Sequence, residues 1–490
     1  MNQRKVKNDG GDLFLNIFRN IFLKKEIFNQ MKLLDKHYHY YLKSLKELNE
    51  IKFKEYISEI TFNDYFNDDN INEESFLKNN NNNNNWNDLI IKSIKFGNSF
   101  NKIFYLTNFS TSLITIDLGG NSFNQKLSNQ NMLPKSLKSL TLGDKFNQEL
   151  IPFTSLPLGL KYLKIGNSFN QLIEIGSLPN DLEVLILGDS FNKLINSNSI
   201  PSKLKVLELG LQWNQFLLNQ EFKLLKSIEK LKFKGFNQSI YDEKQRVSLL
   251  PPNLKELRFQ CNFNKSIYVG VLPQGLEVLE LGQHFSQQIY KGSLPYSLKS
   301  LDLGKSYYYP IGHNVLPCNL ESIKFSPCSL QDVVFPKNLK SVSIGYYFKS
   351  LHLIGESVET LEVDKVLHGI PSTIKNLKFS SNFNNIIDFA ISIPLTIQSL
   401  DTGNTFNQPL KNSFISNSIT NLTYGDSFNQ PIDKGAISNS NIKHLKFGIS
   451  FKYPLNGDHL PCKLETLTLS KNYPKNNLNN ISKFIKINFI

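Results

Sequence analysis

Residues whose types could carry catalysis or hold a metal are few in this 490-residue chain, and they are widely spaced. His37 and His39 form the one close histidine pair, with no cysteine nearby. Cys318 and Cys328 have nine residues between them, whereas a zinc site needs four ligands, usually with cysteines about two to four residues apart. We therefore predict a histidine pair on a helix surface, buried cysteine side chains and no metal site.

Carboxylates recur at equivalent places in the chain, as at Glu208, Glu280 and Asp302. Two carboxylates on one face can perform acid–base catalysis, but charged residues at such positions are more often simply solvated. The sequence contains no nucleophile-elbow motif, no glycine-rich phosphate or dinucleotide loop and no zinc-protease helix motif. We therefore predict a protein that is not an enzyme and that needs no cofactor.

The overall composition argues against several further classes of protein. The net charge is +13, yet the lysines and arginines are dispersed among acidic residues, which argues against a nucleic-acid partner. No run of about 18 apolar residues is present, so we expect no membrane span. Residues 1–11 do not resemble a secretory signal, and four cysteines are too few for a disulfide scaffold, so we expect an intracellular, cytoplasmic protein.

The elements that position these residues come from an internal repeat. The segment LPKSLKSLTLGDKFNQ begins at Leu133, and the close copies LPLGLKYLKIGNSFNQ and LPNDLEVLILGDSFNK begin at Leu156 and Leu178. One glycine in each copy recurs every 22 or 23 residues, as at Gly143, Gly166, Gly188 and Gly210. We predict about 18 such coils between residues 89 and 470, several of them degenerate.

Each copy is typical of one short strand followed by a turn. Leu140 and Leu142 alternate with polar residues, so they should face inward while their neighbours face outward. Gly143 permits a backbone bend, Phe146 fills the space between coils, and Asn147 can bond backbone groups in the turn and stack with the same asparagine one coil away. Because one coil cannot bury its own apolar face, the pattern predicts a mainly β solenoid with a parallel sheet.

The consensus L-P-x-S-L-K-x-L-x-L-G-x-x-F-N-Q resembles the FNIP repeat, a relative of the leucine-rich repeat. Two copies, at 406–410 and 428–432, complete it as F-N-Q-P-L and F-N-Q-P-I. The resemblance implies a leucine-rich-repeat-like fold, no assigned activity and a role as an interaction module. Some relatives of this type carry an F-box-like N-terminal segment. Other residues replace the glycine in some copies: Lys234, Gln260, Ser326 and Ser380.

The repeats divide the chain into four predicted parts. Residues 1–60 form a helical segment, 61–88 an acidic asparagine-rich linker, 89–470 the solenoid and 471–490 a C-terminal cap. Three interpretations of the helical segment stay open: a cap over the first coil, an F-box-like adaptor, and a membrane-surface helix carrying Phe22, Lys24 and Lys25. An insertion at 242–247 should bulge from the solenoid.

The outward strand positions form the predicted binding face. An apolar group there, with tyrosines that replace the F-N-Q turn, is the predicted partner-binding set. Its members are Tyr162, Val184, Ile186, Val206, Tyr307, Tyr308, Tyr346 and Tyr347. One tyrosine of each turn group should take the buried phenylalanine position.

The function predicted from these features is that of a non-catalytic scaffold, which binds a protein partner through the sheet face. The first alternative is a substrate-recognition adaptor of a ubiquitin ligase. A binder of an anionic surface or nucleic acid is less favoured. The sequence determines neither the partner's identity nor the oligomeric state.

Overall fold

The computed structural model describes residues 39–44, 47, 57–66, 91–104, 106, 112–120, 122–127, 132–217, 221–325, 334–345, 351, 354–365, 369–387, 393–409 and 415–490. Most of the predicted N-terminal helical segment and linker lies outside these residues, as do Tyr346 and Tyr347. The cap, adaptor and membrane-helix interpretations therefore stay predictions.

The chain divides into two compact units, of which the first comprises residues 1–215 and 225–228. Its strands pair in parallel and in chain order. They are β1 His39–Leu42, β2 Glu59–Phe62, β3 Ser93–Lys95, β4 Thr115–Asp117, β5 Ser139–Thr141, β6 Tyr162–Lys164, β7 Val184–Ile186 and β8 Val206–Leu209. A short 3-10 helix, η3 (Ser197–Ser199), lies in the last connection.

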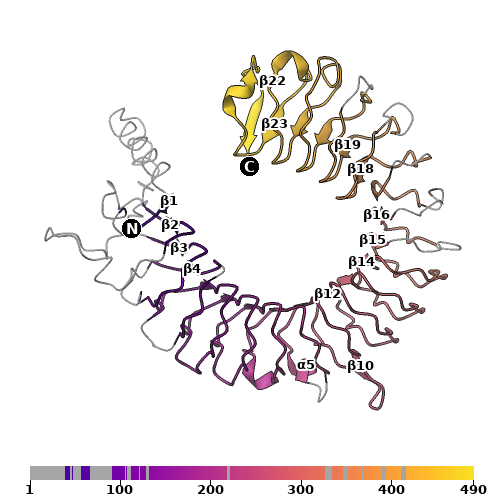
Figure 1. The fold of residues 1–490 in the computed structure, drawn as a ribbon. Helices are drawn as coiled ribbons and strands as arrows, with labels where there is room; N and C mark the ends of the chain where they lie inside the picture. Colours follow the sequence, from indigo (N-terminus) through magenta and orange to yellow (C-terminus); the bar gives the residue numbers. More distant parts are fainter. Residues whose placement is uncertain are drawn as a thin grey trace, which may run out of the picture. The chain divides into compact units, whose positions relative to one another are not determined.

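The second unit comprises residues 216–224 and 229–490 and repeats the same arrangement. Its parallel strands are β9 Lys230–Phe233, β12 Glu256–Phe259, β13 Val278–Glu280, β14 Ser300–Asp302, β15 Ser322–Phe325, β16 Ser341–Ile344, β17 Thr360–Val363, β18 Asn376–Phe379, β19 Ser399–Asp401, β20 Asn421–Thr423, β21 His444–Lys446, β23 Thr466–Leu469 and β25 Lys486–Phe489. Within each unit, the strands lie side by side at one edge of the coils (Figure 1).

Short helices and strands lie in the connections between the main strands of the second unit. They are helix α5 Glu221–Leu224, the strands β10 Tyr241–Asp242, β11 Val247–Ser248, β22 Leu455–Asn456 and β24 Leu478–Asn479, and the 3-10 helices η6 Gly457–His459 and η7 Lys475–Asn477. Strands β10 and β11 form an antiparallel hairpin. The predicted bulge at 242–247 is therefore confirmed as a hairpin that projects from its coil.

The register explains why the apolar positions form a core. Leu140 pairs with Leu163, Leu163 with Leu185, and Leu185 with Leu207, so like positions stack directly. All of these leucines are buried, whereas the residues that flank them in the strands are partly exposed. The prediction of a mainly β solenoid with a parallel sheet is confirmed.

Within each unit, the aromatic side chains that follow neighbouring strands stack on one another in a file, here called the ring file. The ring centroids of Phe123 and Phe146 are 6.2 Å apart, those of Phe146 and Phe169 6.2 Å, and those of Phe169 and Phe191 5.9 Å. In the second unit the file includes Tyr307, whose ring stacks 6.1 Å from Phe285. Phenylalanine therefore does fill the space between coils.

The conserved turn glycines serve a close approach between coils. A Cβ atom at Gly143 would lie 2.5 Å from the carbonyl oxygen of Gly120, and at Gly166 it would collide with the Gly143 backbone. Neither glycine is among those with left-handed φ. At these two positions glycine therefore supplies space for the neighbouring coil, whereas Gly282, Gly304 and Gly403 also have left-handed φ, in agreement with the expected backbone bend.

An asparagine ladder runs beside the ring file. The N–H of Asn147 donates to Oδ1 of Asn124 at 2.9 Å, and the N–H of Asn170 donates to Oδ1 of Asn147 at 2.9 Å. The Nε2 of Gln171 also donates to Oδ1 of Asn147, at 3.0 Å. The predicted association of Asn147 with the same residue one coil away takes the form of hydrogen bonds between coils, which satisfy backbone groups that the turns would otherwise leave unpaired.

The parallel strands begin and end differently from the predicted domain boundaries. Strand β1 lies within the segment predicted as helical, and β2 spans the boundary between that segment and the predicted linker. The two strands pair with each other, and β2 pairs with β3, so the sheet begins well before residue 89. Ile60 and Phe62 of β2 are buried, and the ring of Phe62 stacks 5.3 Å from Phe96, so this segment adds to the core. At the other end, β25 continues the sheet by pairing with β23.

Candidate interaction surface

The outward side of strands β6 to β8 carries a strip of partly exposed apolar side chains. Val184 pairs with Tyr162 on one side and with Val206 on the other, so the three form one row across the strands. Ile186 lies two residues further along β7 in the next row. The structure therefore brings together Tyr162, Val184, Ile186 and Val206, which the sequence predicted as contact residues.

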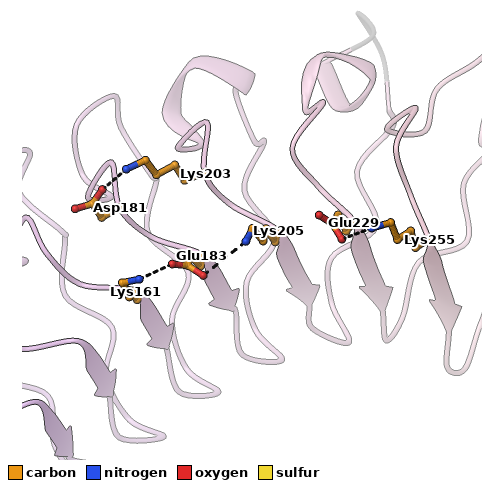
Figure 2. Close-up of polar contacts among 7 residues, drawn as sticks. All are labelled: Lys161, Asp181, Glu183, Lys203, Lys205, Glu229 and Lys255. Atoms are coloured by element: carbon orange, nitrogen blue, oxygen red, sulfur yellow. Dashed lines mark hydrogen bonds and ion pairs between the residues drawn. The ribbon is translucent and has the colours of Figure 1, made fainter. Parts of the chain in front are cut away.

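A row of ion pairs borders this strip, one residue before each strand. The Nζ of Lys161 lies 2.8 Å from Oε1 of Glu183, and the Nζ of Lys205 lies 4.0 Å from Oε2 of Glu183 (Figure 2). Lys203 and Asp181 form a second, parallel pair at 2.6 Å. The hydrogen bond and charge of Lys161 lower the pKa of Glu183, and Glu183 in turn raises the pKa of Lys161.

The second unit has a row of its own at the equivalent positions, in which lysines and glutamates alternate. Lys255 contacts Glu229 at 2.9 Å, as Figure 2 also shows. The further pairs are Lys299–Glu277 at 3.0 Å, Lys340–Glu321 at 2.8 Å, Lys375–Glu359 at 2.5 Å and Lys443–Glu465 at 2.9 Å. Sequence reasoning missed this row, although the residue before each strand shows the alternation.

The recurring carboxylates of the outward face lie beside cations. Arg258 bonds both Glu256 and Glu280, and Lys324 lies 3.7 Å from Asp302. Burial is the main cause of a raised pKa at Glu280, although Arg258 acts in the opposite direction. This arrangement is that of a charge-balanced sheet surface. Across the part of the chain that the structure describes, no group of three or more His, Cys, Asp or Glu residues could hold a metal ion.

Several individual predictions need correction. Tyr307 is fully buried in the ring file, so it cannot contact a partner, whereas Tyr308 is 58% exposed. One tyrosine of this turn thus takes the phenylalanine position, as predicted. His39 lies in β1 rather than on a helix, with Nδ1 3.4 Å from Glu59. Cys318 is exposed because it follows Pro317 in the turn before β15, outside the inward strand positions.

Fold and surface together define a leucine-rich-repeat-like solenoid repeat protein. The FNIP Repeat family model matches residues 100–145, 123–168, 146–190, 169–212, 241–284, 285–328, 406–440 and 439–472. These matches cover more than half of the chain, so the chain belongs to the FNIP repeat family.

Known proteins resemble the chain in sequence and in fold. An FNIP repeat-containing protein of Dictyostelium discoideum is 35% identical over 101 residues, which are 20% of this chain and 19% of that protein. The chain therefore matches only about a fifth of that relative's length. CroV588, described as a novel circular LRR protein, is 28% identical with a TM-score of 0.55, over 90% of this chain and 70% of its own.

A second solved structure is more distant. YopM from Yersinia enterocolitica is 18% identical with a TM-score of 0.29, over 85% of this chain and 73% of its own. In the described parts of the chain, no helix combines the length and apolar character that crossing a membrane requires.

Proposed function

We propose that this chain is a non-catalytic scaffold that binds a protein partner through the outward face of strands β6 to β8. The observation that carries the proposal is the apolar row Tyr162–Val184–Val206 with Ile186 beside it, bordered by the ion pairs of Glu183. An apolar centre with a charged rim is the usual anatomy of a protein interface.

The backbone beneath this strip is rigid enough to favour binding. Strand β7 is hydrogen-bonded to both β6 and β8, and each of the three strands carries a buried leucine on its other side, so little order is lost when a partner docks. Partial burial raises the pKa of Tyr162, so its hydroxyl stays neutral and can donate a hydrogen bond at physiological pH. Partly buried tyrosines are common anchors in protein interfaces, and Tyr162 lies at one end of the apolar row.

Electrostatics favour a protein partner for this face over a nucleic acid. The lysines that border the strip, Lys161, Lys203 and Lys205, each contact an acidic side chain. A nucleic-acid surface needs an excess of positive charge to release counterions from phosphates, and paired lysines supply little of it. In the second unit, the outward carboxylates Glu256, Glu280 and Asp302 lie beside cations in the same way, which supports a role without catalysis.

Affinity purification with a matched surface variant tests the proposal. The full chain, tagged, is compared with V184D/I186D and with the control L395D, which places an acid at an exposed turn position before β19. We expect specific proteins to co-purify with the wild type and the control but not with V184D/I186D, while thermal unfolding of all three stays alike. Identical protein sets from all three chains would refute the proposal.

A further inference from the structure

Five tyrosines follow the ring positions of four successive coils: Tyr241, Tyr268 and Tyr290 lie five residues after the ring, and Tyr308 and Tyr309 lie directly after it. The rings of Tyr241 and Tyr268 lie 5.0 Å apart, and those of Tyr308 and Tyr309 lie 4.7 Å apart. Tyr290 occupies the position equivalent to Tyr268 in the next coil. It lies near enough to Tyr309 to contribute to the raised pKa of the Tyr309 hydroxyl. Tyr268, Tyr290 and Tyr308 are 44%, 57% and 58% exposed.

Between residues 260 and 314 the charges on this side of the coils are all positive, whereas the hairpin that carries Tyr241 is charge-balanced, with Asp242 and Glu243 followed by Lys244 and Arg246. Lys265, Lys291 and Lys305 are exposed, and none of them forms an ion pair in the part of the chain that the structure describes. The acidic residues between positions 260 and 314 lie in or directly before strands, on the sheet side, where cations contact them. They are Glu277, Glu280 and Asp302. This side of the coils therefore combines exposed phenols with uncompensated ammonium groups.

The orientation of the rings indicates which chemistry this surface recognises. Tyr308 and Tyr309 stack with an interplanar angle of 22°, and Tyr241 packs on Tyr268, so ring faces are partly occupied by other rings. Side-chain hydrogen bonds from Tyr309 and Ser286 lower the pKa of Tyr308, so the hydroxyls already take part in polar contacts. Phenol and ammonium donors together suit a ligand rich in anionic acceptors, whereas bases need free ring faces.

We propose that this surface, formed by Tyr241, Tyr268, Tyr290, Tyr308, Tyr309, Lys265, Lys291 and Lys305, binds an acidic segment of a partner protein. The proposal depends on charge complementarity, because the three lysines without an ion pair among the described residues can neutralise the carboxylates of such a segment. This surface is separate from the sheet face of β6 to β8, and the proposal does not depend on partner binding at that face. Figure 1 shows the hairpin strand β10, which carries Tyr241, at the end of its coil away from β12.

The spacing of the coils fits an extended peptide that runs along the stack. Ring centroids one coil apart are separated by 6.0 Å between Phe263 and Phe285 and by 6.1 Å between Phe285 and Tyr307. Alternate residues of an extended chain are about 6.6 Å apart, so every second side chain meets a new coil. Four coils therefore accommodate about eight residues, with acidic side chains at alternate positions.

Binding of a defined peptide to the full chain tests the proposal. The probe is a fluorescein-labelled 12-residue peptide with glutamate at alternate positions and serine between, titrated by fluorescence anisotropy. The variant K265Q/K291Q/K305Q should weaken binding about tenfold or more, since each exposed pair contributes modestly. The control K299Q/K340Q/K375Q removes the same charge from ion-paired lysines beside the sheet and should change Kd less than about twofold. Equal weakening by both sets would overturn the proposal.

Tyrosine variants and a nucleic-acid probe complete the test. Y290S/Y308S should also weaken the peptide at least about threefold. The control Y296S, at a position 75% exposed but outside the series, should not weaken it. A labelled 12-nucleotide single-stranded RNA that binds more tightly than the peptide would overturn the proposal. In that case the logarithm of its affinity should fall with a slope of about −2 against the logarithm of salt, for three phosphate contacts. Circular dichroism of each variant excludes loss of fold as the cause.

Discussion

Replacing Gly210 by alanine should force two neighbouring coils apart. A Cβ atom at Gly210 would lie 2.5 Å from the Cα of Asp189, and it would be closer still to the carbonyl oxygen of Gly188. Both are backbone atoms that cannot rotate away. Because an ordinary contact needs about 3.4 Å, the coils must separate locally by about 1 Å.

That separation breaks hydrogen bonds between the same two coils. The N–H of Gln212 donates to the carbonyl oxygen of Asp189 at 2.8 Å, and Nε1 of Trp213 donates to that of Lys193 at 3.1 Å. Each bond contributes about 1 kcal/mol, and looser packing of the buried Trp213 ring adds a similar amount. We therefore expect the free energy of unfolding to fall by about 2–3 kcal/mol.

Urea unfolding followed by tryptophan fluorescence measures this loss. Trp86→Phe leaves Trp213, three residues after Gly210, as the single reporter. The matched control is Gly275→Ala, since an added Cβ there meets nothing within 4 Å and Gly275 is not among the glycines with left-handed φ. The control should cost less than about 0.5 kcal/mol. Equal midpoints for the two variants would refute the close-approach explanation.

Three further changes test other parts of the fold. Asn170→Ala removes the oxygen that accepts the N–H of Asn192 at 3.0 Å, so stability should fall by about 1 kcal/mol, and hydrogen exchange should show a faster Asn192 amide. Tyr424→Phe should raise stability by about 1 kcal/mol in urea unfolding, because the buried hydroxyl has no partner among the described residues; a clear loss would contradict this. The pKa of Glu183 is lowered from 4.5 by Lys161, so the stability it contributes is present above that value and is lost as pH falls below it. Glu183→Gln should therefore shift the urea midpoint at pH 7 but not at pH 3.

Periodicity in the sequence was sufficient to predict the coil. The alternation at Leu140 and Leu142, the ring at Phe146 and the amide at Asn147 each recur at one position per copy, and each has one structural task. Because a repeated residue must contact its own copy in the next coil, its stacking follows directly from the period. The strand, the ring file and the asparagine ladder were predicted for this reason.

The ends of the array were not predictable in the same way. Strand β2 lacks the Leu-Pro and glycine signals, and its alternating Ile60 and Phe62 lie in a segment rich in acidic and asparagine residues. The composition of this segment therefore weighed more in the prediction than an alternating pattern only four residues long. The strand forms because the exposed edge and apolar side of β3 supply pairing that the local sequence does not reveal.

Some surface features were predictable from the repeat, and others were not. The strip Tyr162–Val184–Val206 was predictable because all three share one position of the repeat, and neighbouring copies become neighbours in space. Tyr308 was predicted as a contact residue, but Tyr268 and Tyr290 escaped prediction because they lie five residues after the ring, in a stretch with little consensus. Folding brings Tyr290 of that stretch near Tyr309.

The close glycine contact has a consequence for how such an array can change in length. Each glycine meets the glycine of the preceding copy, as at Gly188 against Gly166, so every junction between regular copies is chemically the same. Duplication or loss of one complete copy recreates an identical junction, whereas gain or loss of a few residues opposes a side chain to a backbone. Genetic recombination between copies can therefore lengthen or shorten the protein in whole units, and it can move a surface patch along the molecule without redesigning its support.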